Sequence, residues 1–174
     1  MLTIMLTYDA VDGTRAADAP WTAHPVGYRR FEQVVLIGEG TTHWEAASAA
    51  VLRWEVKTRS GFAVEGAGPD PEVMEGQDCE LVAMLGPIRL REPVRVVTVV
   101  NGPDRCGFSY GTREGHPVSG EEAFIVHRSP DGRVWFTLRS LTRPAPGIRR
   151  LAFPIALLAQ RFYRRRYTRA LVAG

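Results

Sequence analysis

The sequence predicts one α+β domain in which a curved antiparallel sheet packs on a long C-terminal helix. Apolar runs rich in β-branched and aromatic residues follow one another across residues 78–141, with turn residues between them. An apolar face at helical spacing precedes them in residues 42–57, and a second one follows in residues 147–172. Sequential strands with short turns pair antiparallel, and the apolar helix faces need a sheet to cover them.

The composition is that of a soluble globular protein. The 174 residues are 45% hydrophobic and 24% charged, which allows one core and is too apolar for a disordered chain. No uncharged apolar run reaches the roughly 18 residues of a membrane-spanning helix. Residues 1–10 lack a basic region before an apolar stretch, so no signal peptide is expected. Cys79 and Cys106 fit neither a metal spacing nor a disulfide framework, which favours a reducing, cytoplasmic location.

The first third of the chain predicts an irregular lead-in, one strand and one helix. Residues 1–27 are rich in Ala, Asp, Gly and Pro, as surface segments are, and residues 28–37 are typical of a strand. Thr42 and Glu45 have the spacing of a capping box at the start of helix 42–57. The apolar face of this helix consists of Trp44, Ala47, Val51 and Trp54.

The middle of the chain predicts strands separated by tight turns. The sequence S-P-D-G at residues 129–132 is typical of a hairpin turn, and N-G-P-D at 101–104 also predicts a turn. The predicted strands cover residues 79–90, 94–100, 106–112, 122–128 and 133–141.

The predicted C-terminal helix, residues 147–172, is amphipathic and basic. Residues 143–174 contain eight arginines and no acid, which leaves the remainder of the chain at −5 out of a formal net charge of +3. Such an end could meet nucleic acid, anionic lipid or the acidic body of its own domain. Because a whole face is apolar and should lie on the sheet, we expect the arginines to rim the domain. Nucleic acid is therefore disfavoured, while peripheral contact with anionic lipid stays open. The large side chains of the apolar stripe are Ile148, Leu151, Ile155, Leu158 and Phe162, followed after Arg166 by Ala170, with Ala152, Ala159 and Tyr163 beside them.

This order of elements is that of the helix-grip fold (START or Bet v 1-like), which commonly encloses an apolar cavity. The analogy concerns the fold and does not by itself specify an activity.

A histidine lies between three glycines in the connection of two predicted strands. Residues 107–124 read GFSYGTREGHPVSGEEAF, and the glycines permit a tight path between the strands. His116 with Tyr110, Glu121 or Glu122 supplies the groups that general acid–base catalysis needs. The competing interpretation is structural, with His116 and one glutamate fixing the loop by hydrogen bonds.

The two glutamates are predicted to point to opposite faces of their strand. Side chains alternate along a strand, so Glu122 shares a face with Phe124 and Glu121 lies on the other face. A carboxylate on an inward face needs a partner, and Arg139 or Arg143 is the expected one.

The same segment resembles the DUF1990 family, also called UPF0548, an uncharacterised family of bacteria and plants. One departure is Arg113-Glu114, where the family usually has Leu-Pro, so the loop tip is expected to differ. The resemblance implies no agreed activity. The family's hallmark, Y-G-T…G-H-P…G-E-E-x-F, is matched by Tyr110, Gly111, Thr112, Gly115, His116, Pro117, Gly120, Glu121, Glu122 and Phe124. Further matches along the chain are Leu6-Thr7-Tyr8, Pro25, Gly27, Tyr28, Gly38, Gly40, Trp44, Trp54, Arg143-Pro144, Pro154, Gln160-Arg161 and Arg169-Ala170-Leu171.

Two functions remain open from the sequence. The first is binding of a small apolar or lipid-like molecule between sheet and C-terminal helix, with Tyr110 and His116 near a polar mouth. The alternative is an enzyme, a hydrolase or cyclase, with His116 as base and Glu121 or Glu122 orienting it. No cofactor or metal is expected, because the four histidines are scattered and no metal-ligand spacing occurs. The predicted ligand-binding walls are Phe108, Tyr110, Phe124, Phe136, Leu158 and Phe162.

Overall fold

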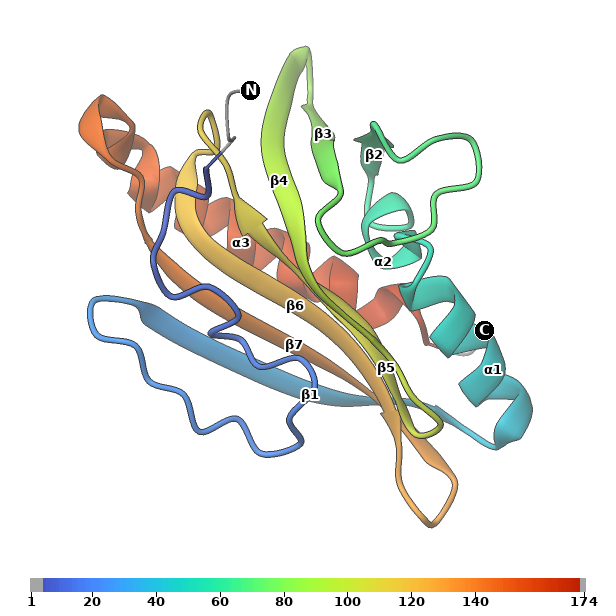
Figure 1. Cartoon of the computed structure of the whole chain (residues 1–174). Coiled ribbons are helices and arrows are strands. Elements are labelled where there is room, and N and C mark those ends of the chain that lie inside the picture. Colours follow the sequence, from blue (N-terminus) through green and yellow to red (C-terminus); the bar gives the residue numbers. More distant parts are fainter. Residues whose placement is uncertain (1–4, 173–174) are drawn as a thin grey trace.

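A computed structural model describes residues 5–172, so the predicted lead-in is described from residue 5 onward and residues 1–4 lie outside the described part. The helices are α1 (Thr41–Val51), α2 (Glu55–Thr58), the 3₁₀ helix η1 (Gly147–Ala152) and α3 (Phe153–Ala170) (Figure 1). The strands are β1 (Arg29–Glu39), β2 (Phe62–Glu65), β3 (Asp78–Leu85), β4 (Ile88–Asn101), β5 (Arg105–Thr112), β6 (Val118–Arg128) and β7 (Arg133–Pro144).

The seven strands form one antiparallel sheet in the order β1-β7-β6-β5-β4-β3-β2. Consecutive strands from β3 to β7 are neighbours joined by short connections, and β2 pairs with β3 after the longer segment 66–77. Strand β1 pairs with β7 to form the other edge. The register shifts between Leu36 and Gly38 and between Val96 and Thr98, and such irregularities increase the local twist of a sheet. The predicted curved antiparallel sheet with a C-terminal helix is confirmed.

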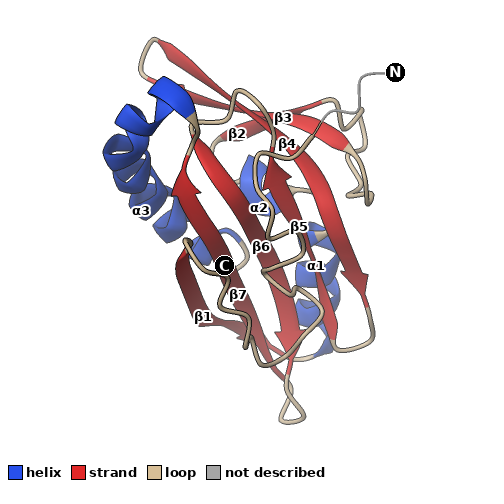
Figure 2. Ribbon diagram, turned by 60° about the vertical axis from the view of Figure 1, so that its left-hand side comes forward, coloured by secondary structure: helices blue, strands red, loops and turns tan. Residues whose placement is uncertain are grey.

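The two faces of the sheet are covered differently. The three α-helices lie on one face, while the lead-in crosses the other face (Figures 1 and 2). The main core lies between the helices and the sheet and includes Trp54, Phe108, Phe124 and Phe136. A small second cluster lies beneath the lead-in, where Ala16 contacts Ala123 and Ile125. The even-numbered side chains of β6 therefore face the helices, and the odd-numbered ones face the lead-in.

The predicted helix 42–57 is not continuous. Helix α1 ends at Val51, and Trp54 adopts a left-handed conformation with φ +63° before the single turn of α2. This conformation costs roughly 1–2 kcal/mol for a non-glycine residue. The cost is offset because Trp54 becomes fully buried, with its ring centroid 4.7 Å from that of Phe108. The predicted capping box is also absent, since Gly40 occupies the N-cap without a side-chain bond.

The predicted apolar stripe of the C-terminal helix does not face the sheet. Leu158 and Phe162 are 66% and 52% exposed, and Ile148, Leu151 and Ile155 are more exposed still. The side chains of α3 that become buried are Tyr163 and Tyr167, which pack beside Phe62. The helical period was predicted correctly, but the face that contacts the sheet was not.

The described helices and the two cysteines bear on membrane spanning and on disulfide formation. Across residues 5–172, no helix combines the length and hydropathy needed to span a bilayer. Cys79 and Cys106 are buried free thiols. Pro154 lies in the first turn of α3, where its missing N–H leaves no helical bond unmade.

Gly120 marks a very close approach of two strands. A Cβ at this position would lie 1.9 Å from the carbonyl oxygen of Leu141 on β7. We expect Gly120→Ala to lower the free energy of unfolding by about 3 kcal/mol, the upper end for overpacking. The control is Gly132→Ala in the β6–β7 turn, where φ is +83° but no atom lies within 4 Å, so only roughly 1–2 kcal/mol of backbone strain is added. Urea unfolding measures both, and equal losses would contradict the steric explanation.

Candidate functional site

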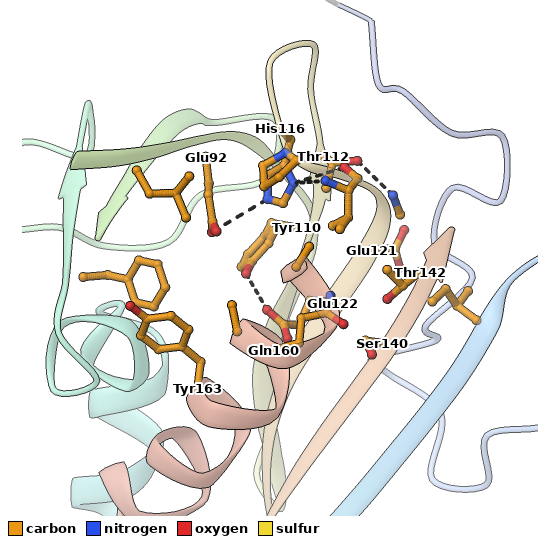
Figure 3. Close-up of a pocket in the computed structure, with 18 of the residues that line it drawn as sticks. Glu92, Tyr110, Thr112, His116, Glu121, Glu122, Ser140, Thr142, Gln160 and Tyr163 are labelled. Carbon is orange, nitrogen blue, oxygen red and sulfur yellow. Dashed lines mark hydrogen bonds and ion pairs between the residues drawn. The ribbon is translucent and has the colours of Figure 1, made fainter. Parts of the chain in front are cut away.

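A cavity of about 220 Å³ lies between the helix-covered face of the sheet and the segment η1–α3 (Figure 3). Its wall on the helix side is built from small side chains, because Ala152, Ala156 and Ala159 stand where larger residues would fill the space. Tyr163 and Tyr167 close the end nearest the C-terminus. The apolar lining on the other side is provided by Phe62, Leu90, Pro117, Val118 and Leu141.

The side chain of Lys57 forms the charged centre of this cavity. It is 1% exposed, and its Nζ donates to the hydroxyl of Tyr167 at 2.6 Å and lies 3.3 Å from Oε2 of Glu122. Four aromatic rings have centroids between 4.5 and 5.2 Å from Nζ. The ion pair and the ring faces together stabilise an ammonium group away from water. The four rings belong to Phe62, Tyr110, Phe124 and Tyr167.

Tyr110 and Glu122 meet because β5 and β6 place them directly opposite each other. The hydroxyl of Tyr110 donates to Oε2 of Glu122 at 2.5 Å. Burial, followed by the nearby Glu122 charge, raises the pKa of Tyr110 and of Tyr167 well above the usual value. Both phenols therefore keep their protons at neutral pH. The hydroxyl of Tyr110 donates to Glu122, whereas that of Tyr167 accepts from Lys57.

The prediction that Arg139 or Arg143 pairs with the inward glutamate is wrong. Arg139 lies on the opposite face, where its Nε pairs with Glu32 at 2.7 Å, and Arg143 pairs with Asp9 near the surface. Glu122 pairs with Lys57 instead, which reaches it from α2. The prediction that an inward carboxylate needs a cationic partner holds, but the partner comes from a different element.

His116 is 7% exposed and contacts Glu92 on β4. Nδ1 of His116 lies 3.1 Å from both the backbone nitrogen and the carbonyl oxygen of Val118, and Nε2 lies 3.8 Å from Oε2 of Glu92. Burial and then the positive charge of Lys57 lower the pKa of His116 to about 3. Burial raises the pKa of Glu92 to about 7, with Lys57 opposing the shift.

These values do not favour the expected role of His116 as the base. An imidazole with so low a pKa is a weak base, whereas a carboxyl that titrates near neutrality can both accept and donate a proton. Glu92 is therefore the group in this cavity best matched to proton transfer, and His116 holds the loop after β5 through its bond to Val118.

Glu121 borders the cavity but directs its carboxylate to the opposite face of the sheet. The carboxylate accepts hydrogen bonds from the hydroxyl of Tyr8 at 2.6 Å, the backbone N–H of Asp12 at 2.8 Å and that of Thr14 at 3.0 Å, and the Thr14 hydroxyl also donates to it. Burial raises the pKa of Glu121, and these hydrogen bonds oppose the shift. Glu121 holds the lead-in to the sheet and lies on the opposite face from Glu122, as the alternation along β6 predicted.

Of the six predicted ligand-binding residues, the structure places Tyr110 in the lining of the cavity. Phe108, Phe124 and Phe136 are fully buried in the core behind the cavity. Leu158 and Phe162 face solvent, because α3 turns its tyrosines toward the sheet. These five placements correct the expectation that one apolar set surrounds a ligand.

Sequence reasoning missed Lys57 and Glu92. They lie 35 positions apart in the printed sequence, and only folding brings both beside the histidine loop. One signal was available for the lysine, since 21 of the 22 basic residues are arginine and Lys57 is the exception. Glu92 stands between Arg91 and Pro93 in a strand and carries no comparable signal.

The curved antiparallel sheet with the helix packed on it is a helix-grip-like fold. A hypothetical protein from Helicobacter pylori superposes with a TM-score of 0.60 at 11% identity, covering 97% of each chain. The crystal structure of Ara h 8.0201 superposes with a TM-score of 0.50 at 10% identity, covering 83% of this chain and 99% of that one. Such low identities establish the fold alone.

Within this fold, the chain belongs to the DUF1990 family, a domain of unknown function whose sequence profile matches residues 7–170. A UPF0548 protein of Deinococcus radiodurans is 37% identical over 146 residues, which cover 79% of this chain and 74% of that protein. A UPF0548 protein of Arabidopsis thaliana is 29% identical over 147 residues, covering 79% and 69% respectively. The resemblance seen in the histidine motif is confirmed.

The role of Glu121 predicts a localised effect on the lead-in. Glu121→Gln replaces one acceptor oxygen by an NH₂ donor, which then faces either the donors of Tyr8 and Asp12 or the two donors of Thr14. We expect a loss of about 1–3 kcal/mol in the free energy of unfolding. The lead-in should also detach, so that trypsin cleaves after the exposed Arg15 faster than in the wild type. Limited proteolysis with mass spectrometry measures this. Glu114→Gln in the exposed loop is the control, and equal cleavage of both variants would refute the assignment.

The shifted pKa values of His116 and Glu92 predict opposing effects of pH on stability. His116 titrates at 6.5 when unfolded and about 3 when folded, so it makes the fold less stable as pH falls below 6.5. Glu92 titrates at 4.5 when unfolded and about 7 when folded, so it makes the fold less stable as pH rises from 4.5 to 7. In the wild type the two slopes oppose each other between pH 4.5 and 6.5.

Single variants should separate the two slopes. Relative to the wild type, Glu92→Gln should make the free energy of unfolding rise with pH by up to about 1.4 kcal/mol per unit in this window. His116→Gln should make it fall with pH by a similar amount. Urea unfolding at a series of pH values measures both slopes. Curves parallel to that of the wild type would show that the groups titrate normally.

Proposed function

We propose that this protein binds a small molecule with an apolar body and one hydrogen-bond acceptor, such as a carbonyl oxygen, in the cavity beneath α3. The observation that carries the proposal is the position of Lys57 on the cavity wall. Its ammonium has three N–H donors, and within residues 5–172 it meets two acceptors, Tyr167 and Glu122. A ligand acceptor would satisfy the third donor.

The apolar part of the cavity limits the size of the ligand. Sites for drug-sized molecules usually measure about 300–1,000 Å³, so a cavity of about 220 Å³ suits a smaller molecule. The alanines of η1 and α3 offer an apolar surface without filling the space. Helix-grip folds commonly enclose such a cavity, which supports binding as the general role.

Gln160, on α3, provides a second polar group in the cavity lining. Its side chain lines the cavity, and its buried Oε1 has no hydrogen-bond partner in the described part of the chain. A buried acceptor left unpaired costs free energy, which a donor on the ligand would recover. The ligand class that fits best therefore carries an acceptor for Lys57 and, on its other side, a donor for Gln160.

A matched pair of small probes tests the role of Lys57. Acetophenone and toluene share an aromatic body, but acetophenone alone has a carbonyl oxygen. We expect acetophenone to bind about 10–100-fold more tightly, because a hydrogen bond to a charged donor contributes roughly 1.5–3 kcal/mol. Ligand-observed NMR titration measures both affinities, and native mass spectrometry of the purified protein tests for a natural ligand that copurifies.

Two variants make the test specific. The double substitution Lys57→Met with Glu122→Gln removes the ion pair without leaving a lone buried charge, and it should abolish the preference for acetophenone while toluene still binds. Ala156→Trp should fill the cavity and abolish binding of both probes, whereas Ile88→Trp on the exposed β3–β4 hairpin should not. Failure of the wild type to bind either probe, together with no copurified molecule, would contradict the proposed function.

Glu92 favours a second candidate function, an enzyme that transfers a proton to or from the bound molecule. Its carboxyl lies on the cavity wall, and burial raises its pKa to about 7, the range suited to acid–base catalysis. The expected hydrolase or cyclase would then use Glu92 in place of His116. If a copurified molecule is turned over, Glu92→Gln should abolish turnover and leave acetophenone binding intact. Equal turnover by the variant would exclude Glu92 as the acid or base.

A further inference from the structure

The outer face of η1–α3 is an exposed apolar stripe. Its five large side chains are between 52% and 83% exposed. They recur every three or four positions, so they follow one side of the helical segment. Scattered apolar side chains are common on protein surfaces, but a continuous row of this kind marks a contact surface. The stripe consists of Ile148, Leu151, Ile155, Leu158 and Phe162.

The same segment is surrounded by positive charge. Residues 147–172 contain seven arginines and no acid. None of the seven forms an ion pair with a carboxylate of residues 5–172, whereas arginines elsewhere in the chain often do. Their charges are therefore available to a partner. The exposed ones are Arg149, Arg150, Arg161, Arg165, Arg166 and Arg169.

An arginine-lined groove of about 320 Å³ lies beside the stripe, between β1 and α3. Arg29 and Arg30 line it from β1, Arg161 and Arg164 line it from α3, and no carboxylate takes part in the lining. The guanidinium of Arg164 lies 3.6 Å from the ring centroid of Phe31, and its buried Nε has no hydrogen-bond partner in the described chain. The guanidinium of Arg30 donates to the carbonyl of Trp21 in the lead-in, so Arg29, Arg161 and Arg164 are the groove residues suited to a phosphate group.

The helical repeat places the groove and the stripe next to each other around α3. With 3.6 residues per turn, Arg161 and Arg165 lie between the groove residue Arg164 and the stripe residues Leu158 and Phe162. The resulting order around the helix is phosphate-binding groove, exposed arginines and apolar side chains. A helix that lies in a membrane interface has this order, with cations at the headgroups and apolar side chains below them.

We propose that η1–α3 docks this protein on the surface of an anionic phospholipid membrane, with the apolar stripe at the acyl boundary and a headgroup phosphate in the arginine groove. A second copy of the chain fits less well, because a symmetric contact would bring seven unpaired arginines against seven. Nucleic acid would satisfy the arginines but leave five apolar side chains in water. An anionic lipid surface satisfies both.

The charged centre of the cavity takes no part in this contact. The stripe and the groove use the outer and lateral faces of α3, while Lys57 lies beneath the helix. The double variant Lys57→Met with Glu122→Gln should therefore bind membranes as the wild type does, so failure of the proposed cavity function and failure of the membrane contact can be told apart.

Vesicle co-sedimentation tests the proposal. We expect the wild type to bind vesicles that contain both phosphatidylcholine and phosphatidylglycerol, and not to bind vesicles of phosphatidylcholine alone. Binding should weaken at high salt. Replacing Arg161 and Arg165 by Gln should weaken binding about tenfold to thirtyfold, from the roughly fivefold contribution of each basic residue near an anionic surface. Replacing Leu158 and Phe162 by Ser should abolish binding even at low salt.

Matched controls lie on distant hairpins. Arg133→Gln in the β6–β7 hairpin removes an exposed arginine, and Ile88→Ser in the β3–β4 hairpin removes a 64% exposed apolar side chain. Both should bind vesicles as the wild type does. Equal binding to neutral and anionic vesicles, or full binding by the Leu158 and Phe162 variant, would overturn the proposal. So would sedimentation equilibrium showing that the stripe joins two copies in a dimer that does not bind vesicles.

Discussion

The buried contact between Lys57 and Glu122 is the constraint on which the arrangement of the helices depends. The ammonium comes from α2, the carboxylate from β6, and the hydroxyl of Tyr167 from α3, so one charged group joins three elements. A buried charge without its partner costs about 3–5 kcal/mol, which makes this geometry hard to abandon. It explains why the chain accepts a left-handed Trp54, because the turn at this residue directs Lys57 inward beneath the tyrosines.

The same contact determines which face of α3 meets the sheet. Tyr167 must reach the ammonium, and Tyr163, one turn earlier, packs beside Phe62. A helix has one inward face at a given point, so fixing it by these tyrosines forces Leu158 and Phe162 outward. The hydrophobic period of the segment was therefore real, but hydrophobicity alone favoured the wrong face. A polar group buried in the core outweighed the apolar stripe in setting the orientation of the helix.

The sequence predicted what local patterns determine. The strands, the S-P-D-G hairpin and the division of Glu121 and Glu122 between two faces follow from a period of two residues and from turn chemistry. The partner of Glu122 could not be found in this way, since Lys57 is 65 positions away and meets it only through tertiary packing. The pKa of Glu92 was inaccessible for the same reason, because burial causes it and local sequence does not report burial. The histidine motif marked Tyr110, His116 and Glu122 of the cavity lining, and the single lysine among 22 basic residues was the one further sequence feature available.

The segment 147–162, which comprises η1 and the first half of α3, packs less tightly on the sheet than the rest of α3. None of its side chains is buried, whereas Tyr163, Tyr167 and Leu171 anchor the other half. Regions with few buried contacts open at a low free-energy cost, so this half of the helix is the part of the cavity wall that moves most easily. The proposed ligand lies on its inner side and the proposed membrane contact on its outer side. If either contact shifts the segment, thermodynamic linkage requires the two affinities to change by the same factor. The cavity side of this weakly packed segment therefore carries small alanines, while its large apolar side chains, with Ile155 at the edge of the cavity, serve the outer contact.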